Sequence, residues 1–271
     1  QIREINLNPV EGAAKGALKL NGKAVEAEFA FENLSLLWKA VLRDGSHYLR
    51  TELEVTAQQD VAMRGLVAMK YTYDNQFGKQ LPQVVGNTRG AVIANDKIFA
   101  GLETPMGINT VASAPTVETS QLQGLWSRQT TLAAGKTWQV GAVVGLIAPD
   151  QARRSFLAYS DRERAVPWRA TPVYISWYEL NIDRNNSKDY SENMTSKQCV
   201  DVIKHWNKDF FKKYKKEVKA FVFDDGWDEY GTWTFNKNFS NGFKDMDKEA
   251  RKMGSCIGAW LGPVGGYAQS G

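Results

Sequence analysis

Three short apolar runs in the second half of the chain each end in residues whose side chains suit sugar binding. Residues 176–179 read Ser-Trp-Tyr-Glu, residues 224–227 read Asp-Asp-Gly-Trp, and residues 260–262 read Trp-Leu-Gly. Each end carries a tryptophan, and the first two also carry carboxylates. Aromatic rings pack against the C–H faces of sugars, and carboxylates accept hydrogen bonds from hydroxyls. The candidate substrate-binding residues are Trp177, Glu179, Asp224, Asp225, Trp227 and Trp260.

The adjacent Asp224 and Asp225 are better suited to binding hydroxyls than to breaking a glycosidic bond. Consecutive residues of a strand point to opposite sides. A retaining glycosidase needs two carboxyl groups ~5 Å apart across one bond, and an inverting one needs ~6.5–9.5 Å. Neither geometry suits neighbours on one strand, so we expect no catalytic residue among the candidates. The alternative interpretation is structural, with the three tryptophans capping a core and Asp-Asp-Gly forming only a turn.

These candidates need parallel strands to bring them to one edge of a sheet. Residues 173–177, 218–223 and 256–261 are apolar runs of the kind found in parallel strands that are covered on both faces. Between the first two runs, apolar residues from 199 to 214 recur at spacings of four, three, four and four, which predicts an amphipathic helix. Thr195 and Gln198 fit a capping box at its start.

The second connection also predicts a helix. Residues 242–253 have a helical pattern that stops at Gly254. The order strand, helix, strand, helix, strand predicts a parallel sheet with right-handed crossovers. A complete (β/α)8 barrel needs ~250 residues. We therefore expect the first three βα units of such a barrel, truncated here, and a chain that is the front part of a longer protein.

The first half of the chain has a different pattern. Residues 25–31 and 49–55 alternate between apolar and polar side chains, which is typical of half-buried antiparallel strands. Turn signals such as Asn21-Gly22 and Asp44-Gly45 recur between the runs. No segment before residue 165 has a long helical period. The sequence predicts a β-sandwich domain over residues 1–165 and a partial barrel over residues 166–271.

Composition excludes several classes of protein. The formal charge of the 271 residues is only +4, which disfavours a dedicated nucleic-acid binder. The longest apolar stretch is far below the ~20 residues that span a bilayer. Two cysteines and two histidines support neither a disulfide framework nor a metal site, and we expect no cofactor. The chain begins with Gln1 instead of Met, from which we expect an exported protein whose signal has been removed.

The three strand ends together resemble the first three barrel strands of the α-galactosidase clan of glycoside hydrolases. The nearest likeness is to the raffinose-type α-galactosidases of family 36, which carry a large β-sandwich before the barrel. The Asp-Asp-Gly-Trp element at residues 224–227 is the most specific part, and residues 238–254 resemble the connection that follows it in the family. The likeness covers roughly the last hundred residues, a part of one barrel.

The resemblance implies a role for each matched residue. Asp224 and Asp225 would bind the 4- and 6-hydroxyls of a terminal galactose, and Trp177 and Trp260 would line the pocket. In the clan the nucleophile follows the fourth strand and the acid/base the sixth, so this chain alone should be inactive. Residues 261–264 read Leu-Gly-Pro-Val where these enzymes usually have Phe-Glu-Pro-Glu, which leaves the sugar and linkage open.

The implied function is a retaining exo-α-glycosidase, α-galactosidase-like, whose partner is an oligosaccharide or glycoside. Two alternatives stay open. The chain could be a carbohydrate-binding protein without catalysis, with Trp126 and Trp138 of the sandwich as platforms. It could also belong to a related α-glycosidase barrel family, because acidic second strands recur among them.

Overall fold

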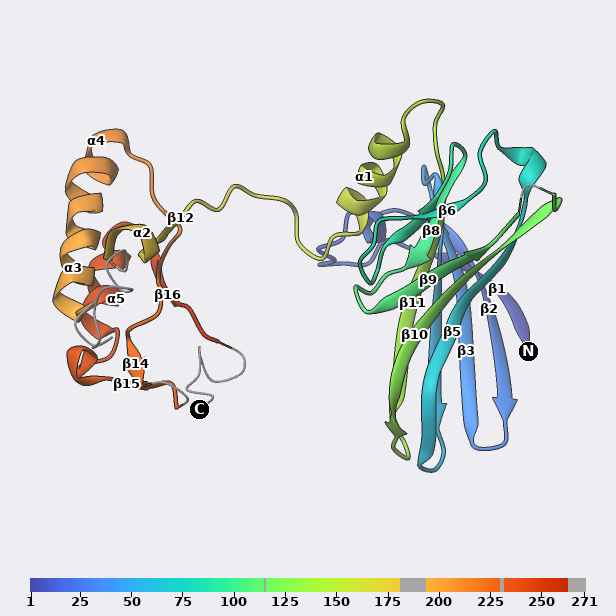
Figure 1. Cartoon of the computed structure of the whole chain (residues 1–271), viewed down its shortest axis with the longest axis horizontal. Coiled ribbons are helices and arrows are strands. Elements are labelled where there is room, and N and C mark those ends of the chain that lie inside the picture. Colours follow the sequence, from blue (N-terminus) through green and yellow to red (C-terminus); the bar gives the residue numbers. More distant parts are fainter. Residues whose placement is uncertain (115, 181–193, 230–231, 263–271) are drawn as a thin grey trace. The chain divides into compact units, whose positions relative to one another are not determined.

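Antiparallel strands make up most of the first part of the chain. The computed structural model describes residues 1–114, 116–180, 194–229 and 232–262 (Figure 1). The chain divides into two units, Gln1–Trp168 and Arg169–Gly271. Each unit is built around its own hydrophobic core, and each is described separately below.

The first unit contains two antiparallel sheets. The larger has eight strands in the order β1-β2-β3-β4-β11-β8-β7-β6, and the smaller has three in the order β5-β10-β9. The strands of the larger sheet are β1 (Ile2–Leu7), β2 (Gly22–Phe31), β3 (Leu34–Arg43), β4 (Tyr48–Ala57), β6 (Gln83–Val85), β7 (Val92–Ala94), β8 (Ile98–Leu102) and β11 (Thr137–Leu146). Those of the smaller are β5 (Val61–Asp74), β9 (Gly107–Ala112) and β10 (Thr119–Leu132). Single 3-10 turns occur at η1 (Ala17–Lys19) and η2 (Asn75–Phe77).

The main core of the first unit lies between these two sheets. Alternate residues of the strands point inwards, as the period of two requires. Val55, Ile93, Leu122 and Leu132 are among the fully buried side chains of this core. The predicted antiparallel sandwich is therefore present in the first unit.

A helix, α1 (Ala152–Glu163), ends the first unit and corrects the expectation of strands alone before residue 165. Its Phe156 and Tyr159 pack against the buried Phe99, at ring-centroid distances of 5.4 and 5.5 Å. The helix has only a narrow apolar stripe, and several of its inward side chains are polar. The spacing of hydrophobic residues therefore does not indicate this helix.

The second unit contains a three-stranded parallel sheet in the order β12-β13-β16. These strands are β12 (Val173–Ile175), β13 (Ala220–Phe223) and β16 (Cys256–Ala259). The helical elements are α2 (Trp177–Leu180), α3 (Ser196–His205), the π-helical η5 (Trp206–Phe211), α4 (Lys212–Tyr214), the 3-10 turn η6 (Lys237–Phe239) and α5 (Lys244–Arg251). A small hairpin, β14 (Asp228–Glu229) and β15 (Thr234–Phe235), follows β13.

The helix signals read from the sequence appear at the predicted places. Thr195 accepts a hydrogen bond from the main-chain N–H of Gln198, and the Gln198 side chain accepts one from the N–H of Thr195, so the capping box is confirmed. Gly254 follows α5 with a φ of +73°, a conformation that glycine adopts without strain. Helices α3 and α5 pack on the same face of the sheet, over Phe221 and Phe223.

The opposite face of the parallel sheet is not covered by the described residues of the second unit. Val173 and Ile175 pair with Ala220 and Val222 on that face, and both β12 side chains are exposed. The expectation of strands buried on both faces is thus met on one face only. Parallel sheets are normally covered on both sides, and within the described residues of the second unit only one side of this sheet is covered.

Candidate functional site

The parallel register brings the three strand ends to one edge of the sheet. The N–H of Ser176 donates to the carbonyl of Val222 at 3.1 Å, and the N–H of Trp260 donates to the carbonyl of Phe223 at 2.9 Å. Each of the three neighbouring strands is therefore followed at this edge by one residue of the site, namely Ser176, Asp224 and Trp260. Ligands of parallel α/β proteins bind beyond this edge of the sheet.

Asp224 is positioned by hydrogen bonds to the residue that follows it and to Ser176, the residue after β12. Its N–H donates to the hydroxyl oxygen of Ser176 at 2.8 Å, and its Oδ1 accepts from the N–H of Asp225 at 2.8 Å. Ser176 is fully buried and its hydroxyl also contacts the sulfur of Met194 at 3.7 Å. Asp224 is half-buried, and both hydrogen bonds fix it relative to the end of β13.

Asp225 and the following turn lie deeper. Asp225 is 1% exposed, and Gly226 has a φ of +113°, which lets the chain turn sharply after the two acids. Asn236 closes this turn from the other side. Its side-chain amide donates to the carbonyl of Gly226 at 2.8 Å and its N–H to the carbonyl of Trp227 at 3.1 Å. Asn236 therefore lies next to Gly226 and Trp227, at the end of β13.

Trp227 lies within the core, and its ring is not an open surface. Its Nε1–H donates to the carbonyl of Trp260 at 3.1 Å, and its ring contacts Phe235 and Phe243 at centroid distances of 5.5 and 5.3 Å. The side chain is 5% exposed. This tryptophan joins the second strand end to the third and holds the β14–β15 hairpin.

Trp177 and Trp260 are half-buried. Trp260 directly follows β16, and Trp177 is the second residue after β12. Glu179 is directed elsewhere. Its Oε2 accepts a hydrogen bond from the hydroxyl of Tyr174 at 2.7 Å. Tyr174 belongs to the core beneath α3, where burial, followed by the Glu179 carboxylate, raises the pKa of its hydroxyl. The structure therefore brings Asp224, Asp225, Trp227 and Trp260 together and ties Glu179 to the helix-covered face.

Two neighbours of the acids were not singled out from the sequence. Ser176 carries no charge or ring, and only its buried contact with Asp224 reveals it. Asp228 begins the hairpin, and burial raises the pKa of its carboxyl, with a further rise from the nearby Asp225 carboxylate. A third acid beside the predicted pair was visible in the sequence as Asp-Asp-Gly-Trp-Asp, but nothing there placed it close to Asp225.

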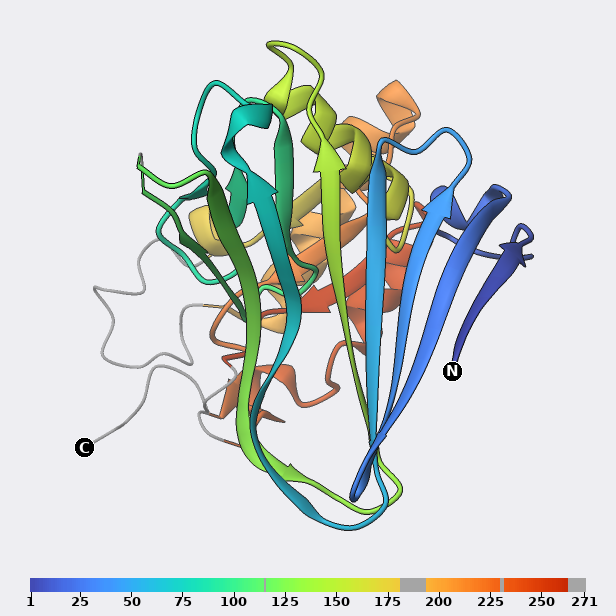
Figure 2. The same cartoon turned by 90° about the vertical axis from the view of Figure 1, so that its right-hand side faces the viewer.

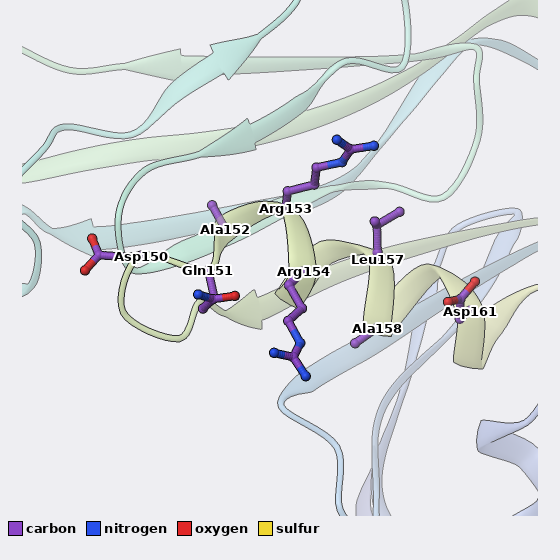
Figure 3. Close-up of a pocket in the computed structure, with 8 residues that line it drawn as sticks. All are labelled: Asp150, Gln151, Ala152, Arg153, Arg154, Leu157, Ala158 and Asp161. Carbon is purple, nitrogen blue, oxygen red and sulfur yellow. The ribbon is translucent and has the colours of Figure 1, made fainter.

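Other surfaces contain none of the predicted residues. A hollow of about 440 Å³ lies on the outer side of α1, where Arg153 and Arg154 point to opposite sides (Figure 3). A second, of about 570 Å³, lies between α3 and α5. Among the described residues no cluster of three or more histidine, cysteine, aspartate or glutamate side chains could hold a metal ion. No helix in the described ranges has the length and apolar character of a membrane span.

The tryptophans proposed as platforms in the sandwich are covered by an arginine. The rings of Trp126 and Trp138 lie 6.0 Å apart, and both pack against the core between the sheets. The guanidinium of Arg128 lies 4.7 Å from the first ring and 4.9 Å from the second. A cation over both aromatic rings occupies the surface that a sugar would need.

One solved structure shares the fold over nearly the whole chain. It is a variant of the family 36 α-galactosidase AgaA from Geobacillus stearothermophilus, in complex with stachyose. The TM-score is 0.53 at 13% identity, and the match covers 97% of this chain and 43% of that one. The chain thus spans less than half of the length of this glycoside hydrolase. At that identity the likeness shows a shared fold alone.

Two further structures have lower similarity. A heparinase III matches 54% of this chain and 21% of its own length, with a TM-score of 0.32 and 8% identity. A structure described as a kojibiose phosphorylase from the human microbiome matches 59% and 28%, with a TM-score of 0.28 and 9% identity. No protein-family model matches the sequence, and no curated protein matches it.

Proposed function

We propose that the chain is part of a retaining exo-α-glycosidase, α-galactosidase-like, and that the ends of β12, β13 and β16 bind the terminal sugar of its substrate. The observation that carries the proposal is the meeting of Asp224, Asp225 and Trp260 at one edge of a parallel sheet. Carboxylates and an indole at this edge suit a sugar, whose hydroxyls donate hydrogen bonds and whose C–H face is apolar.

The parallel sheet would be the opening part of a (β/α)8 barrel. Its uncovered face, with Val173 and Ile175 exposed, has the apolar character of a barrel interior. Strands β12 and β16 are the two edges of the sheet, and each would pair with a further barrel strand. The remaining strands would come from a part of the protein that this chain does not contain.

Within such an enzyme the described residues bind and orient the sugar. Asp224 would accept hydrogen bonds from hydroxyls at the surface, while Ser176 and the N–H of Asp225 fix the position of its main chain and carboxylate. Trp177 and Trp260 would pack against the ring, and Asp225 would bound the bottom of the site. The double displacement of a retaining enzyme needs a nucleophile and an acid/base ~5 Å apart, which these neighbours do not supply.

Calorimetry with methyl α-galactoside tests the binding site. Asp224→Asn should weaken binding by roughly 10-fold or more, since a hydrogen bond to a charged group contributes ~1.5–3 kcal/mol. Asp201→Asn is the matched control, because Asp201 lies on α3 and forms an ion pair with Lys197 at 3.4 Å. Equal affinities of the two variants would move the site away from the strand ends.

Hydrolysis by the whole protein tests the enzymatic part. Nitrophenyl α-galactoside should be cleaved, with an α-anomeric product released first, as expected of a retaining mechanism. This chain alone should release no nitrophenol. Failure of the whole protein on the α-galactoside and on its α-glucoside and α-N-acetylgalactosaminide relatives would exclude the enzymatic proposal, while sugar binding by Asp224 would then favour a binding protein.

A further inference from the structure

An arginine of the sandwich is held beside two tryptophan rings without an anionic partner among the described residues. The guanidinium carbon of Arg128, on β10, lies 4.7 Å from the ring centroid of Trp126 and 4.9 Å from that of Trp138 on β11. The two rings are inclined at 59° to each other. The Arg128 side chain is exposed, and within the described ranges it forms neither an ion pair nor a hydrogen bond. Its N–H donors are therefore available to a ligand.

The main chain around Arg128 is a β-bulge. The register between β10 and β5 shifts after Ser127 and is regular again from Thr130, which leaves two residues of β10 opposite a single residue of β5. One of the two is Gln129, whose φ is +43°. A bulge bends its strand and changes the direction of the side chains on it. The position of Arg128 is therefore set by the main chain as well as by the two rings.

The neighbouring cations add to the charge of Arg128. The single β5 residue opposite the bulge is Arg64, which is exposed and has no ion pair in the part of the chain that the structure describes. Lys136 is exposed in the turn that joins β10 to β11. The acid beside this turn, Asp60, accepts a hydrogen bond from the N–H of Ala134 at 2.8 Å. An anion would thus approach a region of positive potential.

Arg128 lies toward the end of the sandwich away from α1. Trp138 is near the start of β11, while α1 follows the far end of that strand, ~27 Å away for eight residues of extended chain. The last turn of α1 is held at that far end, because Arg162 donates to the carbonyl of Gly45 at 2.7 Å, in the turn before β4. Figure 2 shows the β10–β11 connection and α1 at opposite ends of the first unit. The chain therefore leaves the first unit far from Arg128.

We propose that Arg128 binds the carboxylate of an acidic sugar, at a site separate from the strand ends of the second unit. A guanidinium presents its N–H groups as a planar fork that matches a carboxylate. Its contacts with the two rings use the charge and leave these donors free. The same cation that keeps a neutral sugar from the rings of Trp126 and Trp138 would attract an anionic one. Both rings are half-buried, and their remaining surface would contact its C–H groups.

Isothermal titration calorimetry of the chain with methyl α-galacturonide tests the proposal. This sugar has the ring of methyl α-galactoside with a carboxylate in place of the hydroxymethyl group. Arg128→Gln should weaken its binding by ~10-fold or more, because charge-assisted hydrogen bonds are lost. The side chain is exposed, so the circular dichroism spectrum should stay the same. Arg89→Gln, at another exposed arginine without an ion pair among the described residues, is the matched control and should bind as the unmodified chain does.

Two further titrations identify the ligand and the site. Acetate should bind at least ~10-fold more weakly than the galacturonide, because it lacks the sugar ring. Asp224→Asn should leave the galacturonide affinity unchanged, so this test and the test of the strand ends can fail separately.

Several outcomes would overturn the proposal. They are a chain that does not bind the galacturonide, equal affinities of the Arg128→Gln variant and the unmodified chain, and an equal loss in Arg89→Gln, which would indicate net charge alone. Acetate binding as tightly as the galacturonide would exclude recognition of a sugar. Loss of binding in the whole protein would show that another part of it occupies Arg128.

Discussion

Ser176 supports the candidate site through the main chain of Asp224. It is fully buried, and its hydroxyl oxygen accepts the N–H of Asp224 at 2.8 Å. Ser176→Ala should lower the free energy of unfolding by ~1–3 kcal/mol, because a buried donor would lose its acceptor. Urea unfolding measures this loss. Ser35→Ala, at an exposed position, should stay within ~0.5 kcal/mol of the unmodified chain, and an equal effect of both changes would contradict the role of Ser176.

Asp228 should make stability depend on pH in the direction opposite to a typical salt-bridged acid. Burial and then the Asp225 carboxylate raise the pKa of Asp228 above its ordinary value. A folded-state pKa above the unfolded one favours folding while the group is protonated, and this advantage is lost as pH rises through the folded pKa. Asp228→Asn should therefore raise the melting temperature at pH 7, and the gain should disappear in acid below the ordinary pKa. Asp201→Asn should show no such gain.

At the scale of single residues the sequence identified positions better than orientations. The apolar runs and turn residues placed Asp224, Asp225 and Trp260 at strand ends, because strand ends are local features. Trp227 packs against Phe243, which is distant in sequence. The direction of the Glu179 side chain is set by its hydrogen bond with Tyr174, which is buried beneath α3. Side-chain direction at a strand end is set by such packing, which periodicity does not contain.

At the scale of elements, α1 is held on the sandwich by a network of charges. Arg50 of β4 forms two hydrogen bonds with Glu103, of 2.8 and 2.5 Å, and lies 3.3 Å from Glu163 of the helix. The hydroxyls of Tyr48 and Tyr159 donate to Glu163 and Glu103 at 2.7 and 2.6 Å. The nearly buried Arg50 thus interacts with one carboxylate next to the sheet, Glu103, and with one on the helix, Glu163.

Removal of this arginine should be costly. Arg50→Met would leave Glu103 and Glu163, whose side chains are 14% and 7% exposed, without their cation. Breaking a buried ion pair in this way costs ~3–5 kcal/mol. Guanidinium unfolding followed by tryptophan fluorescence measures the change, and Arg251→Met, in the exposed pair with Asp247, is the control expected to cost under ~1 kcal/mol. A loss no larger than that of the control would show that the network contributes little.

The elements that could be predicted are those whose signals are local. A capping box and a stop glycine mark α3 and α5 because they act through neighbouring residues. Helix α1 has no side-chain cap, and its inward face includes polar side chains. Ser155 accepts a hydrogen bond from the N–H of Ala148, which lies between β11 and the helix, and Glu163 accepts one from the hydroxyl of Tyr48 in β4. The π-helical turn at Trp206–Phe211 likewise changes the hydrogen-bond pattern without changing the spacing of apolar residues.

At the scale of the whole molecule, the change of pattern along the sequence reflects two separate cores. Alternation in the first part produces sheets with one inner face, and continuous apolar runs in the second produce parallel strands. What the pattern does not contain is how far each face is covered. How far the faces of the sheets are covered depends on which other elements lie over them, and this is a property of the assembled layers.

The connection between the units should be cut by trypsin while the sandwich survives. Residues 165–171 are all exposed and belong to neither a helix nor a strand. Proteases cut exposed main chain that can be extended into their active site, so cleavage is expected after Arg169 and Arg164, leaving a resistant fragment that begins at Gln1. Mass spectrometry identifies its end. The variant Arg164→Gln with Arg169→Gln should remove this product, whereas Lys197→Gln should not. Cleavage after the nearly buried Arg50 before residues 165–171 are cut would show that the first unit is not an independently stable sandwich.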